Sequence, residues 1–179
     1  MTGVLMTTFR NARPQVGLYP AYISADISNV PDGDIVVCLR ARLDTLAGFY
    51  GGLTEAQAGH RYAPGKWSIR EILGHVMDTE RIFGYRALRI ARGDVTPMPG
   101  FDENKYVAAA AHDARSLMNL VDEYRHVRQA TVALFDNFDA AAWSRQGVAN
   151  GYPVSVTALA WMICAHEGHH YSTVKERYL

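Results

Sequence analysis

The chain has 179 residues, of which 49% are hydrophobic and 20% are charged, a composition typical of one soluble globular domain. Its 18 Lys and Arg residues balance 18 Asp and Glu residues, so charge predicts neither nucleic acid nor an anionic membrane as a partner. The longest apolar run, about twelve residues from Val154 to Ala165, is shorter than the roughly 20 residues of a membrane span. With no secretory signal at the start and no disulfide framework, we expect a cytoplasmic protein.

The chain begins with residues 1–30, which show no apolar period. We expect them to form an arm that packs on the rest of the domain or on a second subunit. The segments with the period of amphipathic helices are 34–51, 68–92, 113–137 and 155–177. Ser68 and Glu71 form a capping box at the start of the second helix, and Ser155 is expected to cap the fourth. No segment shows a convincing alternation of a strand.

These elements predict an all-α fold, a four-helix bundle with long crossover loops that occupies residues 1–179 as a single domain. The connections between the helices have roughly 17, 20 and 17 residues, whereas antiparallel neighbours need only about two to eight. Loops of this length allow a crossover that places sequential helices parallel, and they can cover one end of the bundle.

The strongest chemical signal is the sequence HEGHH, residues 166–170. It satisfies H-E-x-x-H, in which two histidines one helical turn apart hold zinc and the glutamate activates water. Zinc peptidases with this motif take their third ligand from downstream, but only nine residues follow His170. The longer pattern H-E-x-x-H-x-x-G-x-x-H is absent too, because Thr173 and Glu176 stand where Gly and His are needed. We therefore reject the peptidase interpretation.

His166 and His170 nevertheless continue the apolar stripe of the fourth helix, where Ile or Leu would be expected. Burying two unpaired imidazoles costs about 1–3 kcal/mol each, and one metal ion satisfies both because neutral imidazole is an ordinary metal ligand. His75 borders the core stripe of the second helix and is the candidate third ligand. Three histidines leave open positions for water or substrate, as in catalytic sites. The alternative for His75 is a hydrogen-bonded core histidine.

The remaining histidines and both cysteines are expected outside this ligand set. We expect His169 beside the site or at a subunit contact. The histidines expected at the surface are His60, His112 and His126. Cys38 and Cys164 are expected to be small buried hydrophobic residues, and Cys164 should face away from His166, because two residues rotate a helix by about 200°.

Three segments, taken together, support a family resemblance. They are PGKWSIREILGHVMDTER (64–81), MPGFDENKYV (98–107) and HEGHHYST (166–173). Their order and content resemble the DinB/YfiT-like superfamily of four-helix-bundle metalloproteins. The resemblance implies that His75, His166 and His170 bind a divalent metal ion, zinc or nickel, and that the protein is a homodimer. The sequence departs from the family pattern at residues 171–173, where many relatives carry an Arg-Gly-Gln-like run, so the substrate site is expected to differ.

The resemblance also implies an enzyme, because members include thiol S-transferases and a thiol-dependent isomerase. We expect transfer of a low-molecular-weight thiol to an electrophilic small molecule, with the thiol as a cosubstrate because neither cysteine is placed to act as the nucleophile. One alternative is a hydrolase that uses metal-bound water, with Glu167 or Asp78 as the catalytic base. Either carboxylate could equally orient an imidazole. A further alternative is a stress-related metal-binding protein without turnover.

The acidic loop after the second helix supplies candidates for the wall of the substrate site. They are Asp102, Glu103 and Tyr106. Trp67 precedes the cap of the second helix, where a large aromatic side chain is expected to anchor the end of the bundle.

Overall fold

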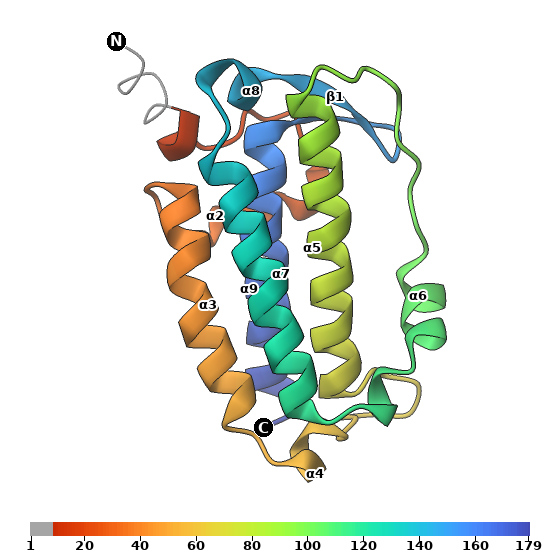
Figure 1. Cartoon of the computed structure of the whole chain (residues 1–179). Helices are drawn as coiled ribbons and strands as arrows, with labels where there is room; N and C mark the ends of the chain where they lie inside the picture. The colour runs from red at the N-terminus through yellow and green to blue at the C-terminus, as the bar shows by residue number, and fades with distance from the viewer. Residues whose placement is uncertain (1–8) are drawn as a thin grey trace.

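The computed structural model describes residues 9–179, which are mostly helical. The four long helices of the bundle are α3 (Ile35–Gly51), α5 (Ile69–Ala91), α7 (Leu117–Asp136) and α9 (Val156–Arg177) (Figure 1). The predicted all-α four-helix bundle is confirmed. The helix ends lie within one residue of the predicted ones, except that α7 begins at Leu117 and not near residue 113. A 3-10 turn, η2 (His112–Ala114), occupies the predicted start, and Ser116 caps the helix.

The direction of the helices shows why the connections are long. In Figure 1, α3 runs downward, α5 and α7 both run upward, and α9 returns downward. The consecutive helices α5 and α7 are therefore parallel, and residues 92–116 cross the length of the bundle between them. This connection carries α6 (Glu103–Ala110). The expected crossover is present, and it lies along α5 at the side of the bundle.

Side-chain caps fix the starts of the bundle helices. Ser68 accepts a hydrogen bond from the amide of Glu71, and the Glu71 carboxylate accepts one from the amide of Ser68 at 2.8 Å. Asp34 caps α3, and Ser155 caps α9 by accepting from the amide of Ala158. These contacts satisfy amide groups that have no partner inside a helix, so the helix starts follow directly from the sequence.

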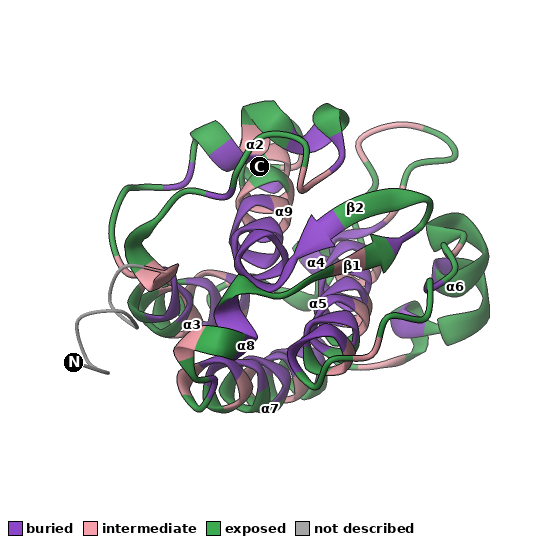
Figure 2. Cartoon of the chain, turned by 90° about the horizontal axis from the view of Figure 1, so that it is seen from above, coloured by how far each residue is buried: buried purple, intermediate pink, exposed green. Residues whose placement is uncertain are grey.

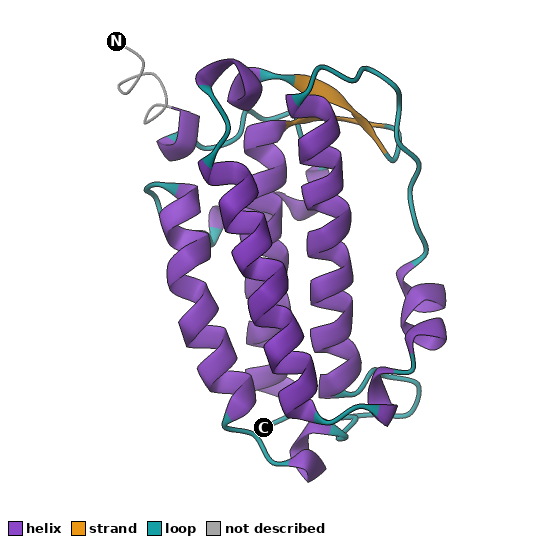
Figure 3. Cartoon of the chain, in the orientation of Figure 1, coloured by secondary structure: helices purple, strands orange, loops and turns teal. Residues whose placement is uncertain are grey.

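The expectation of a chain without strands is wrong. β1 (Gln146–Ala149) and β2 (Tyr152–Ser155) pair as an antiparallel hairpin (Figure 3). Asn150 and Gly151 join them with φ angles of 52° and 78°. A type I′ turn needs positive φ at both central residues, which Asn-Gly tolerates best. The hairpin covers the end of the bundle at which α9 begins.

Two further segments cover the side of the bundle formed by α5 and α9. The predicted arm, as far as it is described, packs on the bundle through η1 (Ala21–Ile23) and α2 (Ser24–Ser28), which both contact α9. Residues 1–8 of that arm lie outside the described residues. On the other side, Met98 in the crossover forms a bridge to Ala149 in the hairpin. The arm, crossover and hairpin thus surround the same face of α5 and α9 (Figure 2).

The core is divided along the bundle axis. One apolar cluster contains Trp143 and Trp161, and a second contains Leu73 and Tyr124. Charged residues that are almost fully buried occupy the helix positions between these clusters: Glu80, Arg128 and Glu167. The remaining short helices are α4 (Glu55–Ala58) and α8 (Ala140–Ser144). Among residues 9–179, no helix is long and apolar enough to cross a membrane.

Candidate metal centre

The structure brings together the three histidines that the sequence singles out. His75 comes from α5, and His166 and His170 come from successive turns of α9. The Nε2 atom of His166 lies 3.0 Å from Nε2 of His75 and 3.1 Å from Nε2 of His170. Among the described residues, this is the group of three or more His, Cys, Asp or Glu side chains that could hold a metal ion.

The donor set fits a divalent metal ion. A neutral imidazole nitrogen carries one hydrogen or one lone pair, so Nε2 of His166 cannot form good hydrogen bonds to both neighbours. A single cation accepts the lone pairs of all three nitrogens. Two nitrogens about 2.1 Å from one ion at ordinary coordination angles are roughly 3.0–3.4 Å apart, and the observed separations of 3.0 and 3.1 Å are close to this range.

Burial keeps these imidazoles in the form that binds metal. Desolvation lowers the pKa of His75 to about 4, against a small opposing effect of the Glu103 charge. Desolvation, together with the neighbouring histidines, lowers the pKa of His170 to about 3 and that of His166 well below its ordinary value. All three rings are neutral near pH 7, so no proton has to be removed before a metal ion binds.

The three histidines lie in the wall of a pocket of about 470 Å³. Apolar side chains from α5, α9, the hairpin and the arm form much of its lining: Phe83, Leu159, Met162, Val154 and Ile23. Its ionic side chains are Asp26, Arg86 and Glu103. A pocket of this size, mostly apolar with a few polar groups, is suited to a small molecule.

Of the three predicted wall residues, Glu103 lines this pocket and the other two do not. Asp102 caps α6 by accepting a hydrogen bond from the amide of Lys105 at 3.1 Å. Tyr106 is 47% exposed and borders a separate shallow hollow next to Asp78. The expectation that Asp102 and Tyr106 line this pocket is therefore wrong, because Asp102 is held at the start of α6 and Tyr106 borders the neighbouring hollow.

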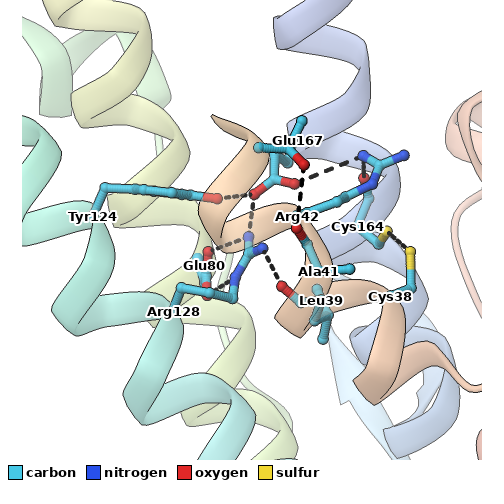
Figure 4. A network of polar contacts seen from close by, with 10 residues as sticks. Cys38, Leu39, Ala41, Arg42, Glu80, Tyr124, Arg128, Cys164 and Glu167 are labelled. Carbon is cyan, nitrogen blue, oxygen red and sulfur yellow. Dashed lines mark hydrogen bonds and ion pairs between the residues drawn. The ribbon is translucent and has the colours of Figure 1, made fainter. Parts of the chain in front are cut away.

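Glu167 is not available as a catalytic base, contrary to one of the predicted roles. Its carboxylate is 1% exposed and lies in the bundle core, where it accepts a hydrogen bond from the Tyr124 hydroxyl at 2.7 Å (Figure 4). Arg128 also donates to it, and Arg42 lies 3.7 Å away. One residue rotates a helix by about 100°, which moves Glu167 from the face of His166 to the interior.

Asp78, the other predicted base, also lies outside the pocket. Its carboxylate pairs with Arg81 at 3.4 Å and lies 3.9 Å from the ring of His112. It borders the same shallow hollow as Tyr106. Asp78 is three residues after His75, so it lies on a neighbouring face of α5, and its side chain faces the crossover. The structure therefore leaves Glu103 and Asp26 as the carboxylates in the pocket lining.

The other histidines are separated from the candidate ligands as expected, with one correction. His60 and His126 are exposed. His169 is exposed beside the site, with Nδ1 3.1 Å from Asp26 and its ring 5.2 Å from that of His170. His112 is buried, not at the surface, because its ring packs against Gly74, where a Cβ atom would lie 2.3 Å from it.

On α5, sequence reasoning missed two polar residues of the pocket, Thr79 and Arg86. Both are buried on α5 on the face of His75, four and eleven residues further along. The Thr79 hydroxyl has no hydrogen-bond partner among the described residues. Arg86 donates to the carbonyl of Pro99 at 2.7 Å, and burial lowers its pKa. The helical spacing from His75 was the available signal.

Trp67 has a second role besides anchoring the end of the bundle. Its ring lies 4.8 Å from that of His75, measured between centroids, and it lines the pocket. Its carbonyl accepts a hydrogen bond from the Tyr178 hydroxyl at 2.8 Å. The Trp67 carbonyl therefore joins the start of α5 to the end of α9, and its indole covers one side of His75.

The family profile of the DinB superfamily matches residues 39–174, which include all three candidate ligands. The match covers most of the chain, and the chain therefore belongs to the DinB superfamily. Its structure is similar to that of YfiT from Bacillus subtilis, with a TM-score of 0.68 and 14% sequence identity over 96% of this chain and 94% of that one. YfiT is described as a probable metal-dependent hydrolase with an unusual four-helix bundle topology. No curated protein matches the sequence significantly.

Proposed function

We propose that the protein is a divalent-metal-dependent enzyme that transfers a low-molecular-weight thiol to an electrophilic small molecule. The observation that carries the metal dependence is the convergence of three neutral Nε2 atoms in the wall of a pocket. His75, His166 and His170 would hold zinc or nickel. Such an ion lowers the pKa of a bound thiol and acts as a Lewis acid.

The placement of the two carboxylates predicted as bases favours thiol transfer over hydrolysis. Hydrolysis by water calls for a general base close to the nucleophile, but Glu167 and Asp78 are both engaged elsewhere. A thiol needs no such base once its pKa is lowered. Cys38 and Cys164 do not line the pocket, so the thiol is a cosubstrate that enters from solution.

The pocket lining supplies a place for each part of a polar thiol and its partner. Phe83, Leu159 and Met162 would pack against the apolar part of the electrophile. Arg86 would pair with a carboxylate of the thiol, because a buried guanidinium favours an anionic partner. The Thr79 hydroxyl, which has no protein partner among the described residues, would donate to the same molecule.

A metal-dependent hydrolase is the second candidate. Glu103 favours it, because its carboxylate lines the pocket and its charge acts on His75. Glu103 would then accept the proton of the attacking water. The description of YfiT as a probable metal-dependent hydrolase supports the same reaction class.

Conjugation assays test the proposal. The zinc- or nickel-loaded protein is incubated with monobromobimane and each of several biological thiols, beside metal-free protein and the His166→Ala variant. We expect metal-dependent conjugation with at least one thiol, and reduction to the uncatalysed rate in both controls. Cleavage of esters or amides without added thiol supports the hydrolase instead. If metal-loaded protein catalyses neither reaction, the result indicates metal binding without turnover.

Glu103→Gln separates the two reactions, with Asp102→Asn as the matched control because Asp102 does not face the pocket. Loss of a general base reduces a rate by about 10²–10⁴-fold. We expect Glu103→Gln to change thiol conjugation by less than about threefold. A loss of about 100-fold or more in the rate of ester or amide hydrolysis, seen in the Glu103 variant and not in the Asp102 variant, would favour the hydrolytic role of this carboxylate.

A further inference from the structure

A pair of thiol side chains lies between α3 and α9, outside the pocket that contains the three histidines. Cys38 on α3 and Cys164 on α9 lie with their Sγ atoms 3.2 Å apart (Figure 4). Both are free thiols, and neither lines the pocket that contains the three histidines. A role as small buried hydrophobic residues does not require the two sulfurs to touch, since any apolar atoms would fill the same space.

We propose that Cys38 and Cys164 are a redox-active dithiol that a hydroperoxide converts into a disulfide, linking α3 covalently to α9. The inference does not depend on the thiol-transfer proposal. A disulfide has a sulfur–sulfur distance of about 2.05 Å, so the sulfurs need to approach by only about 1.1 Å from their separation of 3.2 Å. The packing of α3 on α9 already holds them together.

The surroundings distinguish the two thiols. Cys38 is half-buried, whereas Cys164 is fully buried. The hydrogen bond with Cys164 and the charge of Arg42 lower the pKa of Cys38 to about 6, against desolvation by burial. Arg42 is held at this place by its hydrogen bond to the carbonyl of Cys164 at 3.1 Å. Cys38 is thus the accessible thiol that reacts first, and Cys164 is the partner that resolves the product.

The reaction balances with one equivalent of hydrogen peroxide. The Cys38 sulfur attacks a peroxide oxygen, the O–O bond breaks, and Cys38 becomes a sulfenic acid with release of one water. The Cys164 sulfur then attacks the Cys38 sulfur, the S–O bond breaks, and a second water leaves. The two thiols lose two electrons and two protons, and the peroxide is reduced to two molecules of water.

The link would restrain the bundle at a sensitive place. Cys164 lies on α9 two residues before His166, and Arg42 beside it also approaches Glu167. A disulfide between Cys38 and Cys164 closes a long loop of the chain, and such a link strongly restricts the unfolded state. For a protein of this size we expect oxidation to raise Tm by roughly 5–15 °C.

The test uses the full-length protein, freed of reductant and treated with hydrogen peroxide in slight excess. It is then alkylated under denaturing conditions, weighed as an intact chain and mapped by proteolysis. We expect a mass about 2 Da lower than that of the reduced, unalkylated chain, with no alkylation of either cysteine. Mapping should find a peptide pair joined through Cys38 and Cys164, and Tm should be raised. Dithiothreitol should restore both thiols and the original Tm.

Single variants provide the controls. Cys164→Ser should leave a Cys38 sulfenic acid that dimedone traps, and Cys38→Ser should leave Cys164 unoxidised under the same treatment. Neither variant should show an oxidant-dependent rise in Tm. If Cys164→Ser does not fold, Cys38→Ser at the half-buried position carries the comparison. Two unmodified thiols in oxidised wild type, a sulfinic acid on Cys38 beside a free Cys164, or a disulfide between two chains would each overturn the proposal.

Discussion

What separates the candidate ligands from the other four histidines is the environment of each ring. His75, His166 and His170 point their Nε2 atoms at one another, whereas His60 and His126 are exposed. Burial is not sufficient, because His112 is buried as well, but its ring packs against Gly74 and belongs to no group of three candidate ligands among the described residues. A metal site requires several lone pairs that converge on one point, and only the first three histidines meet that requirement among the described residues.

The lowered pKa of His75 predicts a pH dependence of the metal-free protein. In the unfolded chain a histidine takes up its proton below about pH 6.5, but the folded protein keeps His75 neutral down to about pH 4. The unfolded state therefore binds more protons between these values, and stability falls as pH falls through this window. We expect His75 alone to reduce the free energy of unfolding by about 2 kcal/mol between pH 7 and pH 5.

Urea unfolding of metal-free protein at the two pH values measures this effect. His75→Gln, which cannot titrate, should lose about 2 kcal/mol less than wild type, and His126→Gln should behave as wild type because His126 is exposed. Equal losses in wild type and His75→Gln would show that burial does not keep this ring neutral.

Among the helices, Arg128 of α7 is the side chain that holds the bundle in register around the site. It donates to both carboxylate oxygens of Glu80 on α5, at 2.8 and 2.9 Å, and to Glu167 on α9. It also donates to the carbonyl of Leu39 on α3 at 3.1 Å. One guanidinium on α7 thus contacts the other three long helices. Because Glu167 follows His166 directly, these contacts fix the rotation of α9 that presents His166 and His170 to the pocket.

Removal of Arg128 should therefore affect the fold and the site together. Arg128→Met leaves the buried carboxylate of Glu80 without a cation and leaves that of Glu167 with Arg42 alone, 3.7 Å away. Breaking a buried pair in this way costs about 3–5 kcal/mol of unfolding free energy. Arg125→Met is the matched control, because Arg125 lies on the same helix in a surface pair with Asp122 and should cost less than about 1 kcal/mol. Urea unfolding and zinc titration measure both effects. A change in Arg128→Met no larger than in the control would contradict the role of the network.

The helices could be predicted because their signals are local. Apolar spacing and capping residues such as Ser68 and Ser155 act within a few residues, and the structure reproduces them. The hairpin was missed because its strands have only four residues each, although Asn150-Gly151 was a readable turn signal. Loop length allowed a parallel crossover but could not select α5 and α7 as the parallel pair.

The candidate site, like the fold, could be predicted where its signals are local and not where they depend on contacts between distant segments. His166 and His170 stand on a core stripe, so their inward direction follows from periodicity. The role of Glu167 could not be obtained in that way, because its partners Tyr124 and Arg128 are 43 and 39 residues away. Pairing over such separations depends on how α7 and α9 pack. For the same reason, nothing local brings Cys38 to Cys164.

Seen as a whole, the molecule surrounds one face of α5 and α9 with three irregular segments. The arm contributes Asp26, the crossover contributes Glu103, and the hairpin contributes Asn150 to the pocket that the two helices begin. A four-helix bundle alone presents ligands from its helices. Here the long connections add a wall around them, so the same histidines that can bind a metal ion also face a space of about 470 Å³ for a small molecule.

We infer that one metal ion binds between α5 and α9 through His75, His166 and His170. Elemental analysis after zinc or nickel loading and dialysis tests this inference, together with calorimetric titration of the metal-free protein. We expect one ion per chain in wild type and in His126→Ala, and an affinity lower by more than about 100-fold in His75→Ala. Stoichiometric binding at wild-type affinity in His75→Ala would contradict the three-histidine site.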